Sequence, residues 1–286
     1  MSFAEHAIIW HVYPLGALGA PIRPEAPAPV THRLPNLIGW LDFVVELGCN
    51  ALMLGPVFES VSHGYDTLDF YRIDPRLGTE EDMDALLEAA NQRGIGVLFD
   101  GVFNHVSSSS KYLDLTTGAS FEGPDILAEL DHTNPAVVDL VVDAMNHWLD
   151  RGIAGWRLDA VYAIAPEFWE KVLPEVRRKH PHAWIVGEMI HGDYVQKSGI
   201  DSVTEYELWK AIWSSIKERN FFELEWTLSR HNEFLDTFVP QTFIGNHDVT
   251  RIATRIGQSN AILAAAILFT VGGTPSIYYG DEQGFT

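Results

Sequence analysis

Gly155-Trp-Arg-Leu-Asp159 is a short, mostly apolar segment that ends on a charged side chain, and segments of similar design recur along the chain. Trp184-Ile-Val-Gly-Glu188 has the same layout. Continuous apolar runs with bulky side chains are typical of strands buried on both faces of a sheet. We therefore interpret these segments as parallel strands with polar groups at their carboxyl ends.

Eight such segments alternate with longer helical patterns, which indicates a wound α/β protein. The predicted strands cover residues 8–13, 51–55, 96–100, 155–159, 184–188, 202–206, 241–245 and 276–279. The clearest helical patterns cover residues 37–47, 80–93, 134–151, 166–180, 208–219 and 260–269. No glycine-rich phosphate loop follows the first strand, which favours a (β/α)8 TIM barrel over an open nucleotide-binding sheet.

Two segments, residues 16–35 and 101–133, are too long for ordinary loops. Because predicted strands continue on either side, we expect both to be loops of one catalytic barrel over residues 1–286, with 101–133 as a small excursion. The sequence stops at Thr286, directly after the eighth predicted strand. We therefore expect a barrel without its eighth helix and without a C-terminal β-sandwich. A shortened chain, or association with a partner such as a second copy in a homo-oligomer, would account for this.

Composition excludes several classes of partner. The chain has 286 residues, 47% of them hydrophobic, and 39 acidic against 19 basic side chains give a formal charge of −20. Such a charge repels nucleic acid and anionic membranes, so a neutral partner is expected. Cys49 is the single cysteine, and the longest apolar run, residues 261–269, is too short to span a bilayer. With no pattern typical of a signal peptide, we expect a cytoplasmic protein.

Polar residues gather where the predicted strands end. They are Asp100, Asn104, His105, Arg157, Asp159, Glu188, Asn246, His247 and Asp248. A barrel of about 250 residues repeats roughly every 31 residues, so Asp159 and Glu188 lie about one unit apart and Asp248 about two units further on. The spacing predicts that the three carboxylates meet in one mouth, where burial and like charge raise at least one carboxyl pKa. Arg157, on the same strand face as Asp159, is expected to keep that neighbour ionised.

Two carboxyl groups with opposite roles are what glycoside hydrolysis requires: one attacks the anomeric carbon and the other protonates the leaving oxygen. For any single acid, a helix cap or a surface charge is the plainer explanation, and for a single histidine a structural role. The sequence contains no H-E-x-x-H pairing, so no zinc site is expected. Four polar clusters at strand ends favour the catalytic interpretation.

Four blocks resemble, in order, the signature blocks of the α-amylase superfamily, family 13 of the glycoside hydrolases. They are Asp100-Gly-Val-Phe-Asn-His105, Gly155-Trp-Arg-Leu-Asp159, Gly187-Glu188 and Phe243-Ile-Gly-Asn-His-Asp248. Three further blocks match as well: His63-Gly-Tyr-Asp66, Ile73-Asp-Pro-Arg-Leu-Gly78 and Pro275-Ser-Ile-Tyr-Tyr-Gly-Asp281. The resemblance extends from about the first predicted strand to the eighth.

This resemblance implies a role for each matching residue. Asp159 would be the nucleophile, Glu188 the general acid/base and Asp248 the third carboxylate, which stabilises the transition state. In the substrate-binding set, Arg157 would orient the nucleophile, Tyr65 would stack under the sugar, and His105 and His247 would bind its hydroxyls. We expect Asp100 to be structural.

The chain also departs from the family. Many members carry Lys-His three and four residues after the nucleophile, where this chain has Tyr162-Ala163. The blocks Gly155-Trp-Arg157 and Gly187-Glu-Met-Ile-His191 are more similar to the intracellular cyclomaltodextrinase and neopullulanase group, which implies short or cyclic maltooligosaccharides as substrates. The family's calcium-supported excursion has few acids here, namely Asp114, Glu122, Asp125 and Asp131, so neither calcium nor another cofactor is expected.

The resemblance thus predicts a retaining α-glycosidase that cleaves α-1,4 or α-1,6 glucosidic bonds through a covalent intermediate. Two alternatives remain open at this point. An α-glucan transglycosylase would use the same intermediate, and an inactive amylase-like binding protein would keep the barrel, since fold does not determine function.

Overall fold

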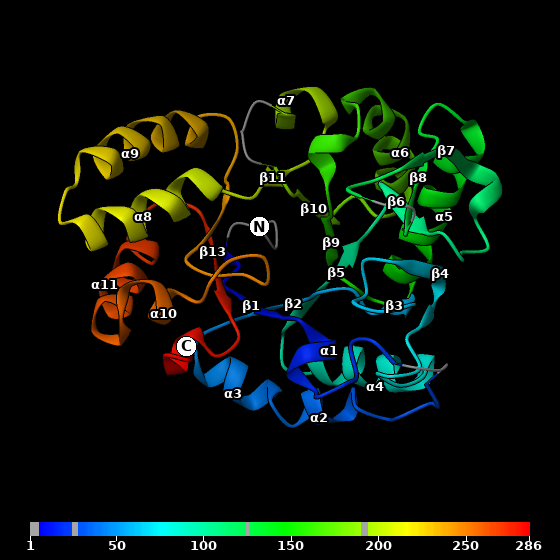
Figure 1. Ribbon diagram of the computed structural model, residues 1–286, viewed down its shortest axis with the longest axis horizontal. Coiled ribbons are helices and arrows are strands. Elements are labelled where there is room, and N and C mark those ends of the chain that lie inside the picture. The colour runs from blue at the N-terminus through cyan, green and yellow to red at the C-terminus, as the bar shows by residue number, and fades with distance from the viewer. Residues whose placement is uncertain (1–5, 25–27, 124–125, 190–193) are drawn as a thin grey trace.

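The computed structural model describes residues 6–24, 28–123, 126–189 and 194–286. At its centre, eight parallel strands form one sheet in the order β11-β10-β9-β5-β2-β1-β13-β12 (Figure 1). They are β1 (Ile9–Val12), β2 (Ala51–Leu54), β5 (Gly96–Gly101), β9 (Gly155–Leu158), β10 (Trp184–Gly187), β11 (Ser202–Val203), β12 (Gln241–Phe243) and β13 (Thr274–Tyr278). A parallel bridge between Thr204 and Gln241 closes the ring between β11 and β12. The predicted (β/α)8 barrel is confirmed.

Helices surround the strands, as Figure 1 shows. They are α1 (Pro14–Ala17), α2 (Pro35–Ile38), α3 (Leu41–Glu46), α4 (Glu80–Asn91), α5 (Pro135–Asp150), α6 (Pro166–Lys179), α7 (Tyr194–Ser198), α8 (Tyr206–Glu218), α9 (Phe222–Leu235), α10 (Ile252–Ile256) and α11 (Gln258–Leu268). The predicted helix 37–47 is interrupted at Gly39 and Trp40, and α9 was not predicted. The exposed face of α9 carries Phe222 and Trp226, which obscures the one-sided apolar pattern of a surface helix.

Strand alternation explains how the charged residues reach the barrel interior. Side chains of a strand point alternately to its two faces. Leu98, Trp184 and Val186 pack inside the barrel, whereas Trp156 and Leu158 belong to the core between strands and helices. Asp100 and Arg157 therefore share the inward direction. Gly155 allows the close approach of β10, because a Cβ atom there would lie 1.9 Å from the carbonyl oxygen of Trp184.

The segment after β5 forms a small antiparallel sheet with strand order β6-β8-β7. Its strands are β6 (His105–Ser107), β7 (Thr116–Ser120) and β8 (Leu127–Leu130). A second antiparallel pair, β3 (Phe58–Ser60) and β4 (Thr67–Ile73), follows β2. Tyr65 lies in the turn between these two strands, so both additions place residues at the carboxyl ends of the barrel strands.

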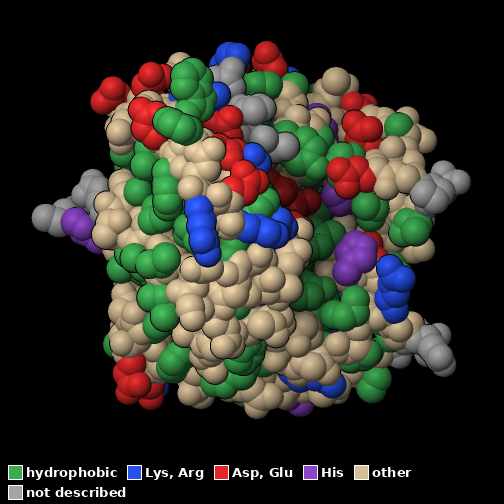
Figure 2. Space-filling view, turned by 60° about the vertical axis from the view of Figure 1, so that its left-hand side comes forward, with side chains coloured by type: hydrophobic (Ala, Val, Ile, Leu, Met, Phe, Trp, Pro, Cys, Tyr) green, Lys and Arg blue, Asp and Glu red, His purple; other side chains and the backbone are tan. Residues whose placement is uncertain are grey.

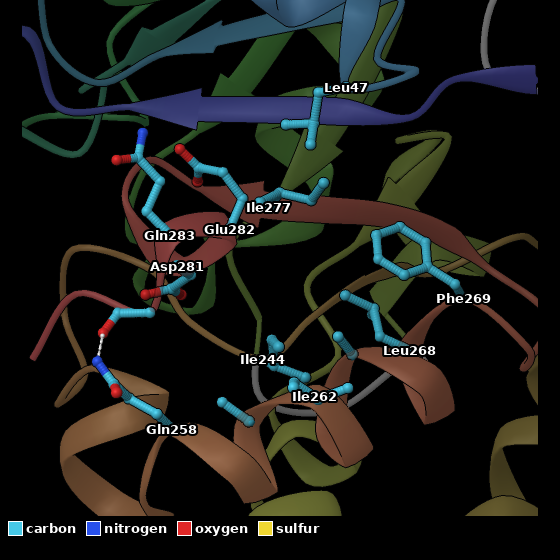
Figure 3. A pocket seen from close by; sticks show the side chains of 13 residues that line it. Leu47, Ile244, Gln258, Ile262, Leu268, Phe269, Ile277, Asp281, Glu282 and Gln283 are labelled. Carbon is cyan, nitrogen blue, oxygen red and sulfur yellow. Dashed lines mark hydrogen bonds between the residues drawn. The ribbon is translucent and has the colours of Figure 1, made fainter.

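An apolar groove of about 470 Å³ lies beside β13 and α11 (Figure 3). Ile244, Ile262, Leu268 and Ile277 are among the residues that line it. The groove contains none of the predicted catalytic carboxylates and is therefore separate from the site described next. Within the described ranges, no helix is both long and apolar enough to cross a membrane.

Candidate active site

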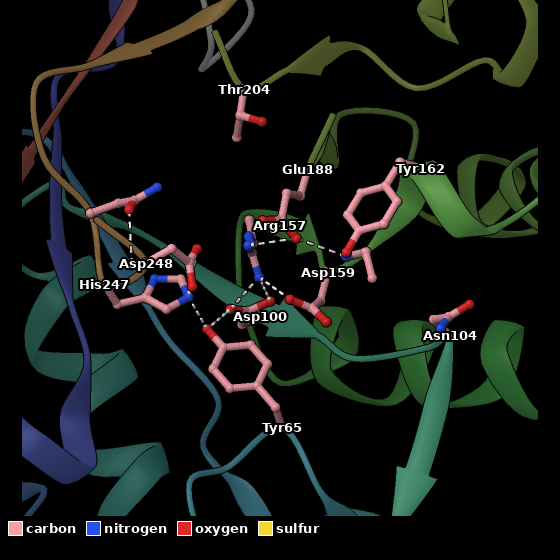
Figure 4. Close-up of polar contacts among 12 residues, drawn as sticks. Tyr65, Asp100, Asn104, Arg157, Asp159, Tyr162, Glu188, Thr204, His247 and Asp248 are labelled. Atoms are coloured by element: carbon pink, nitrogen blue, oxygen red, sulfur yellow. Dashed lines mark hydrogen bonds and ion pairs between the residues drawn. The ribbon is translucent and has the colours of Figure 1, made fainter. Parts of the chain in front are cut away.

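The predicted catalytic residues come together at the carboxyl ends of the barrel strands. Figure 4 shows Arg157 at the centre, with Asp100, Asp159 and Glu188 around its guanidinium group. Asp100 lies near the end of β5, and Asp159 and Glu188 directly follow β9 and β10. The space-filling view in Figure 2 shows a hollow in the surface with acidic side chains in and around it.

One guanidinium group serves three carboxylates. Arg157 Nη1 donates to both oxygens of Asp100 (2.8 and 2.9 Å) and to Asp159 Oδ1 (2.7 Å). Its Nη2 lies 3.1 Å from Glu188 Oε2. Arg157 is buried and cannot be deprotonated, so these contacts fix the two proposed reacting groups relative to each other.

Glu188 is further oriented by the backbone after Asp159. The Ala160 N–H donates to Glu188 Oε2 (2.9 Å). Ala160 adopts a left-handed conformation, with φ 48° and ψ 35°, which is uncommon for a residue with a side chain. Backbone strain of this kind is found mainly where the surrounding structure demands it, often at functional sites. Here it aims the N–H group at the carboxylate.

The four acids differ in exposure, and this suggests a division of roles. The side chain of Asp100 is 1% exposed, that of Asp159 10%, that of Glu188 16% and that of Asp248 44%. Asp100 is thus sealed beneath the site, where it holds Arg157. Asp159 and Glu188 are partly accessible, and Asp248 faces the open side of the mouth.

Burial and mutual repulsion raise the pKa values of three acids. Burial raises the pKa of Asp100 to about 6 and, with Asp100 and Glu188 as neighbours, holds the pKa of Asp159 well above its usual range. The Arg157 contact opposes both shifts. The pKa of Asp248 is also raised, by burial first and then by Glu188. Arg157 thus favours the ionised form of Asp159, as expected, while burial and the two neighbouring carboxylates act against it.

Tyr65 and His247 lie beside Asp100. The Tyr65 hydroxyl donates to Asp100 Oδ2 (3.2 Å) and contacts His247 Nε2. The two rings are stacked, with centroids 5.3 Å apart. Burial, Arg157 and His11 hold the pKa of His247 well below its usual range, so its imidazole ring is neutral.

His105 lies deeper than the resemblance implied. It is buried, its Nε2 is 3.0 Å from the backbone oxygen of Tyr65, and its ring stacks on Phe121 with centroids 4.7 Å apart. Its Nδ1 lies 3.3 Å from Asn104 Nδ2. In this structure His105 supports Tyr65; contact with a sugar stays a prediction.

Sequence reasoning missed Tyr206. We placed it at the end of a strand, but the strand ends at Val203 and Tyr206 begins α8. Its hydroxyl lies between Glu188 Oε1 (3.4 Å) and Asp248 Oδ2 (3.3 Å). A tyrosine at the carboxyl end of the sixth predicted strand was the available signal, because all barrel strands end at the same mouth.

Two acids of the excursion, Asp131 and Glu122, make contacts within the protein. Asp131 Oδ1 accepts hydrogen bonds from the backbone and hydroxyl of Thr133, and Glu122 Oε1 accepts one from Tyr162. Asp125 lies outside the described residues, as does His191. Across the part of the chain that the structure describes, no three His, Cys, Asp or Glu side chains are grouped to hold a metal ion.

Comparison with known proteins identifies the family of the chain. The family model "Alpha amylase, catalytic domain" matches residues 33–122 and 121–286. A cyclomaltodextrinase from Thermoanaerobacter pseudethanolicus is 31% identical over 92% of this chain and 52% of its own length. Neopullulanase 2 from Thermoactinomyces vulgaris is 29% identical over 99% of this chain and 57% of its own length. The chain thus spans about half the length of the curated relatives it matches.

Solved structures give the same picture. The ligand-free cyclic alpha-maltosyl-(1→6)-maltose hydrolase from Arthrobacter globiformis superposes with a TM-score of 0.88 at 26% identity, over 100% of this chain and 76% of that one. An acarbose-soaked debranching enzyme from Nostoc punctiforme gives a TM-score of 0.81 at 26% identity, over 99% of this chain and 76% of that one.

The class of protein is therefore a TIM barrel with a cluster of acidic residues around one arginine at the carboxyl ends of its strands. The matched residues then specify the family. This chain belongs to the α-amylase family, and the model of the family's catalytic domain matches residues 33–122 and 121–286.

Proposed function

We propose that this protein is a retaining α-glycoside hydrolase that cleaves α-1,4 or α-1,6 glucosidic bonds in maltooligosaccharides or cyclic glucans. The observation that supports this most strongly is the sharing of Arg157 by Asp159 and Glu188. It holds a nucleophile and a proton donor beside each other at an accessible mouth, as the double-displacement mechanism requires.

In the first step, the Asp159 carboxylate attacks the anomeric carbon. Glu188 transfers its proton to the glycosidic oxygen, the bond to the leaving sugar breaks, and a glycosyl ester of Asp159 forms. Asp248, the most exposed acid of the cluster, binds hydroxyl groups of the same sugar and strengthens these contacts as the ring flattens. Tyr65 and His247 contribute the remaining contacts to this sugar.

In the second step, the Glu188 carboxylate removes a proton from a water molecule. The water oxygen attacks the anomeric carbon, the ester bond to Asp159 breaks, and Glu188 is protonated again. Two displacements at one carbon restore the α configuration. A sugar hydroxyl in place of water would give the transglycosylase alternative, which products distinguish.

The substrate assignment rests on the relatives. Their names include cyclomaltodextrinase, neopullulanase and cyclic alpha-maltosyl-(1→6)-maltose hydrolase. We assign short or cyclic α-glucans on this basis. Within the same proposal the reaction takes place in the cytoplasm: the single cysteine, Cys49, is a free thiol, and an intracellular maltogenic amylase from Bacillus subtilis is 27% identical over 88% of this chain.

Product analysis tests the proposal. The protein is incubated with maltotriose, pullulan, a cyclodextrin and a branched cyclic glucan, and products are identified over time. Asp159→Asn and Glu188→Gln should each lower turnover on the order of 10⁴-fold without unfolding the protein. Asp139→Asn, at an exposed acid on α5, serves as the control and should leave turnover unchanged. Turnover within about tenfold of wild type in Asp159→Asn would refute the mechanism, and binding without turnover by the wild type would identify an inactive binding protein.

A further inference from the structure

Tyr206 stands at the point where the barrel closes. Thr204 bridges to Gln241, and the Glu205 N–H donates to the Gln241 carbonyl (2.9 Å). α8 begins at the next residue. The closure therefore fixes the backbone of Tyr206 between β10, which ends before Glu188, and the segment after β12, which carries Asp248.

The ring of Tyr206 is held by aromatic neighbours. It packs edge to face against Phe243, with centroids 5.0 Å apart, and against Trp209 at 6.2 Å. Burial, together with Glu188 and Asp248, raises the pKa of Tyr206, so the phenol keeps its proton. The hydroxyl is thus a neutral group that can both donate and accept hydrogen bonds.

Asn246 fixes the position of the hydroxyl oxygen. Asn246 Oδ1 accepts a hydrogen bond from the Asp248 N–H (2.9 Å), which sets the orientation of the amide. Asn246 Nδ2 then donates to Tyr206 Oη (2.9 Å). With one hydrogen bond accepted from Asn246, the phenol has one proton to donate and room to accept a second hydrogen bond.

The contacts of Glu188 locate its transferable proton. Both the Ala160 N–H and Arg157 Nη2 approach Oε2. An oxygen that faces two donors is a poor site for a proton. The proton therefore belongs on Oε1, the oxygen that lies 3.4 Å from the Tyr206 hydroxyl.

We propose that Tyr206 is a positioning residue that orients the proton of Glu188 for transfer to the glycosidic oxygen. While Glu188 is protonated, Tyr206 accepts a hydrogen bond from Oε1–H and donates to Asp248 Oδ2 at 3.3 Å. After the transfer, Oε1 is negatively charged and the phenol O–H turns to it. Asp248 keeps its contact with His247 Nε2 at 3.3 Å throughout. Loss of the hydroxyl thus affects Glu188 more than Asp248.

The inference rests on the proposed function, and leaving-group dependence tests it. Maltotriose needs a proton on its leaving oxygen, whereas the fluoride of α-maltosyl fluoride departs without acid assistance. In Tyr206→Phe, kcat/KM for maltotriose should fall about 10- to 100-fold, since one hydrogen bond to a charged group is lost. For α-maltosyl fluoride the loss should stay below about threefold.

Tyr194→Phe is the matched control. It removes a hydroxyl that donates to the Ile164 carbonyl, and the ratio of the two kcat/KM values should not change. Asn246→Ala keeps the Tyr206 hydroxyl but removes the hydrogen bond that fixes its position. It should shift the ratio in the same direction as Tyr206→Phe and by less. Melting temperatures of all variants show whether they are folded.

The outcomes separate this inference from the proposed function. If the wild type converts neither substrate, the proposed function is wrong. If the wild type converts both and Tyr206→Phe loses the same factor on each, or loses nothing on maltotriose, the positioning role is wrong while the function stands. Should Tyr206→Phe fail to fold, an unchanged ratio in Asn246→Ala overturns the inference.

Discussion

Arg157 determines how the carboxylates of this site behave. A guanidinium group presents several N–H donors in a rigid plane, and here they reach Asp100, Asp159 and Glu188 at once. A lysine ammonium is a point charge on a flexible stem and cannot reproduce this geometry. The positions of Asp159 and Glu188 therefore depend on arginine itself and not only on its charge.

Arg157→Lys should lower kcat by about 100-fold or more with an unchanged KM, because the reacting groups lose their common support while the sugar contacts remain. Steady-state kinetics with maltotriose provide the measurement. Activity above about a tenth of the wild-type value would show that charge alone is sufficient.

The pH dependence follows from the raised pKa of Asp159. As the proposed nucleophile, Asp159 must be ionised, so kcat/KM should fall as pH drops through this raised pKa. The acidic limb of the profile should thus lie above the ordinary aspartate pKa of about 3.9. A profile of kcat/KM that stays flat down to pH 4 would contradict the buried, shared-cation arrangement.

The raised pKa of Asp159 should make the folded state less stable as pH rises, whereas it makes the activity higher. A carboxyl group whose pKa is raised by folding contributes stability below its unfolded-state pKa and loses that contribution as pH rises through the folded-state pKa. Asp159→Asn, which stays neutral, should therefore melt at a higher temperature than wild type at pH 7, and the difference should vanish below about pH 4. Thermal unfolding at both pH values decides this, and a lower melting temperature at pH 7 would oppose the assignment.

Among the elements of secondary structure, the strands were the most predictable. All eight barrel strands were identified from continuous apolar runs, because a strand covered on both faces leaves a clear local pattern; the short antiparallel strands β3, β4, β6, β7 and β8 were not predicted. The meeting of Asp159, Glu188 and Asp248 followed from the repeat length of a barrel. Helix α9 was missed because exposed aromatic residues mask its periodicity.

Other features of the site depend on contacts that no local pattern encodes. The position of Tyr206 is set by the bridge from Thr204 to Gln241, far along the chain. The left-handed conformation of Ala160 accompanies the hydrogen bond from its N–H to Glu188, which the local sequence does not reveal. The sharing of Arg157 among Asp100, Asp159 and Glu188 could be recognised only in three dimensions.

A hydrogen bond joins the excursion after β5 to the loop after β9. The Tyr162 hydroxyl donates to Glu122 Oε1 (3.0 Å), and Tyr162 keeps 45% of its surface exposed. A partly exposed aromatic ring three residues after the nucleophile suits a sugar platform. Tyr162 thus occupies the position where many family members have lysine.

Two replacements of Tyr162 distinguish the contribution of its ring from that of its hydroxyl. Tyr162→Ala should raise KM for maltotriose about tenfold, whereas Tyr162→Phe should change it less than about threefold, because the ring supplies the contact and an exposed hydrogen bond contributes little. Kinetics of both variants provide the comparison. Equal effects would assign the contribution to the bond with Glu122 instead.

The net charge of the whole molecule should affect the stability of the fold but not the rate with a neutral substrate. The formal charge of −20 destabilises the folded state through self-repulsion, which salt screens, whereas a neutral sugar is not attracted or repelled. The melting temperature should therefore rise between 10 and about 300 mM sodium chloride while kcat/KM for maltotriose changes less than about twofold. A strong dependence of kcat/KM on salt would indicate a charged substrate.

The central claim is that Asp159 and Glu188 cleave a glycosidic bond by two successive displacements. Proton NMR of the first products formed from maltotriose, recorded before the anomers equilibrate, tests it most directly. The newly formed reducing ends should have the α configuration. Initial release of the β anomer would contradict it, since that result requires direct attack by water and leaves no place for a glycosyl ester on Asp159.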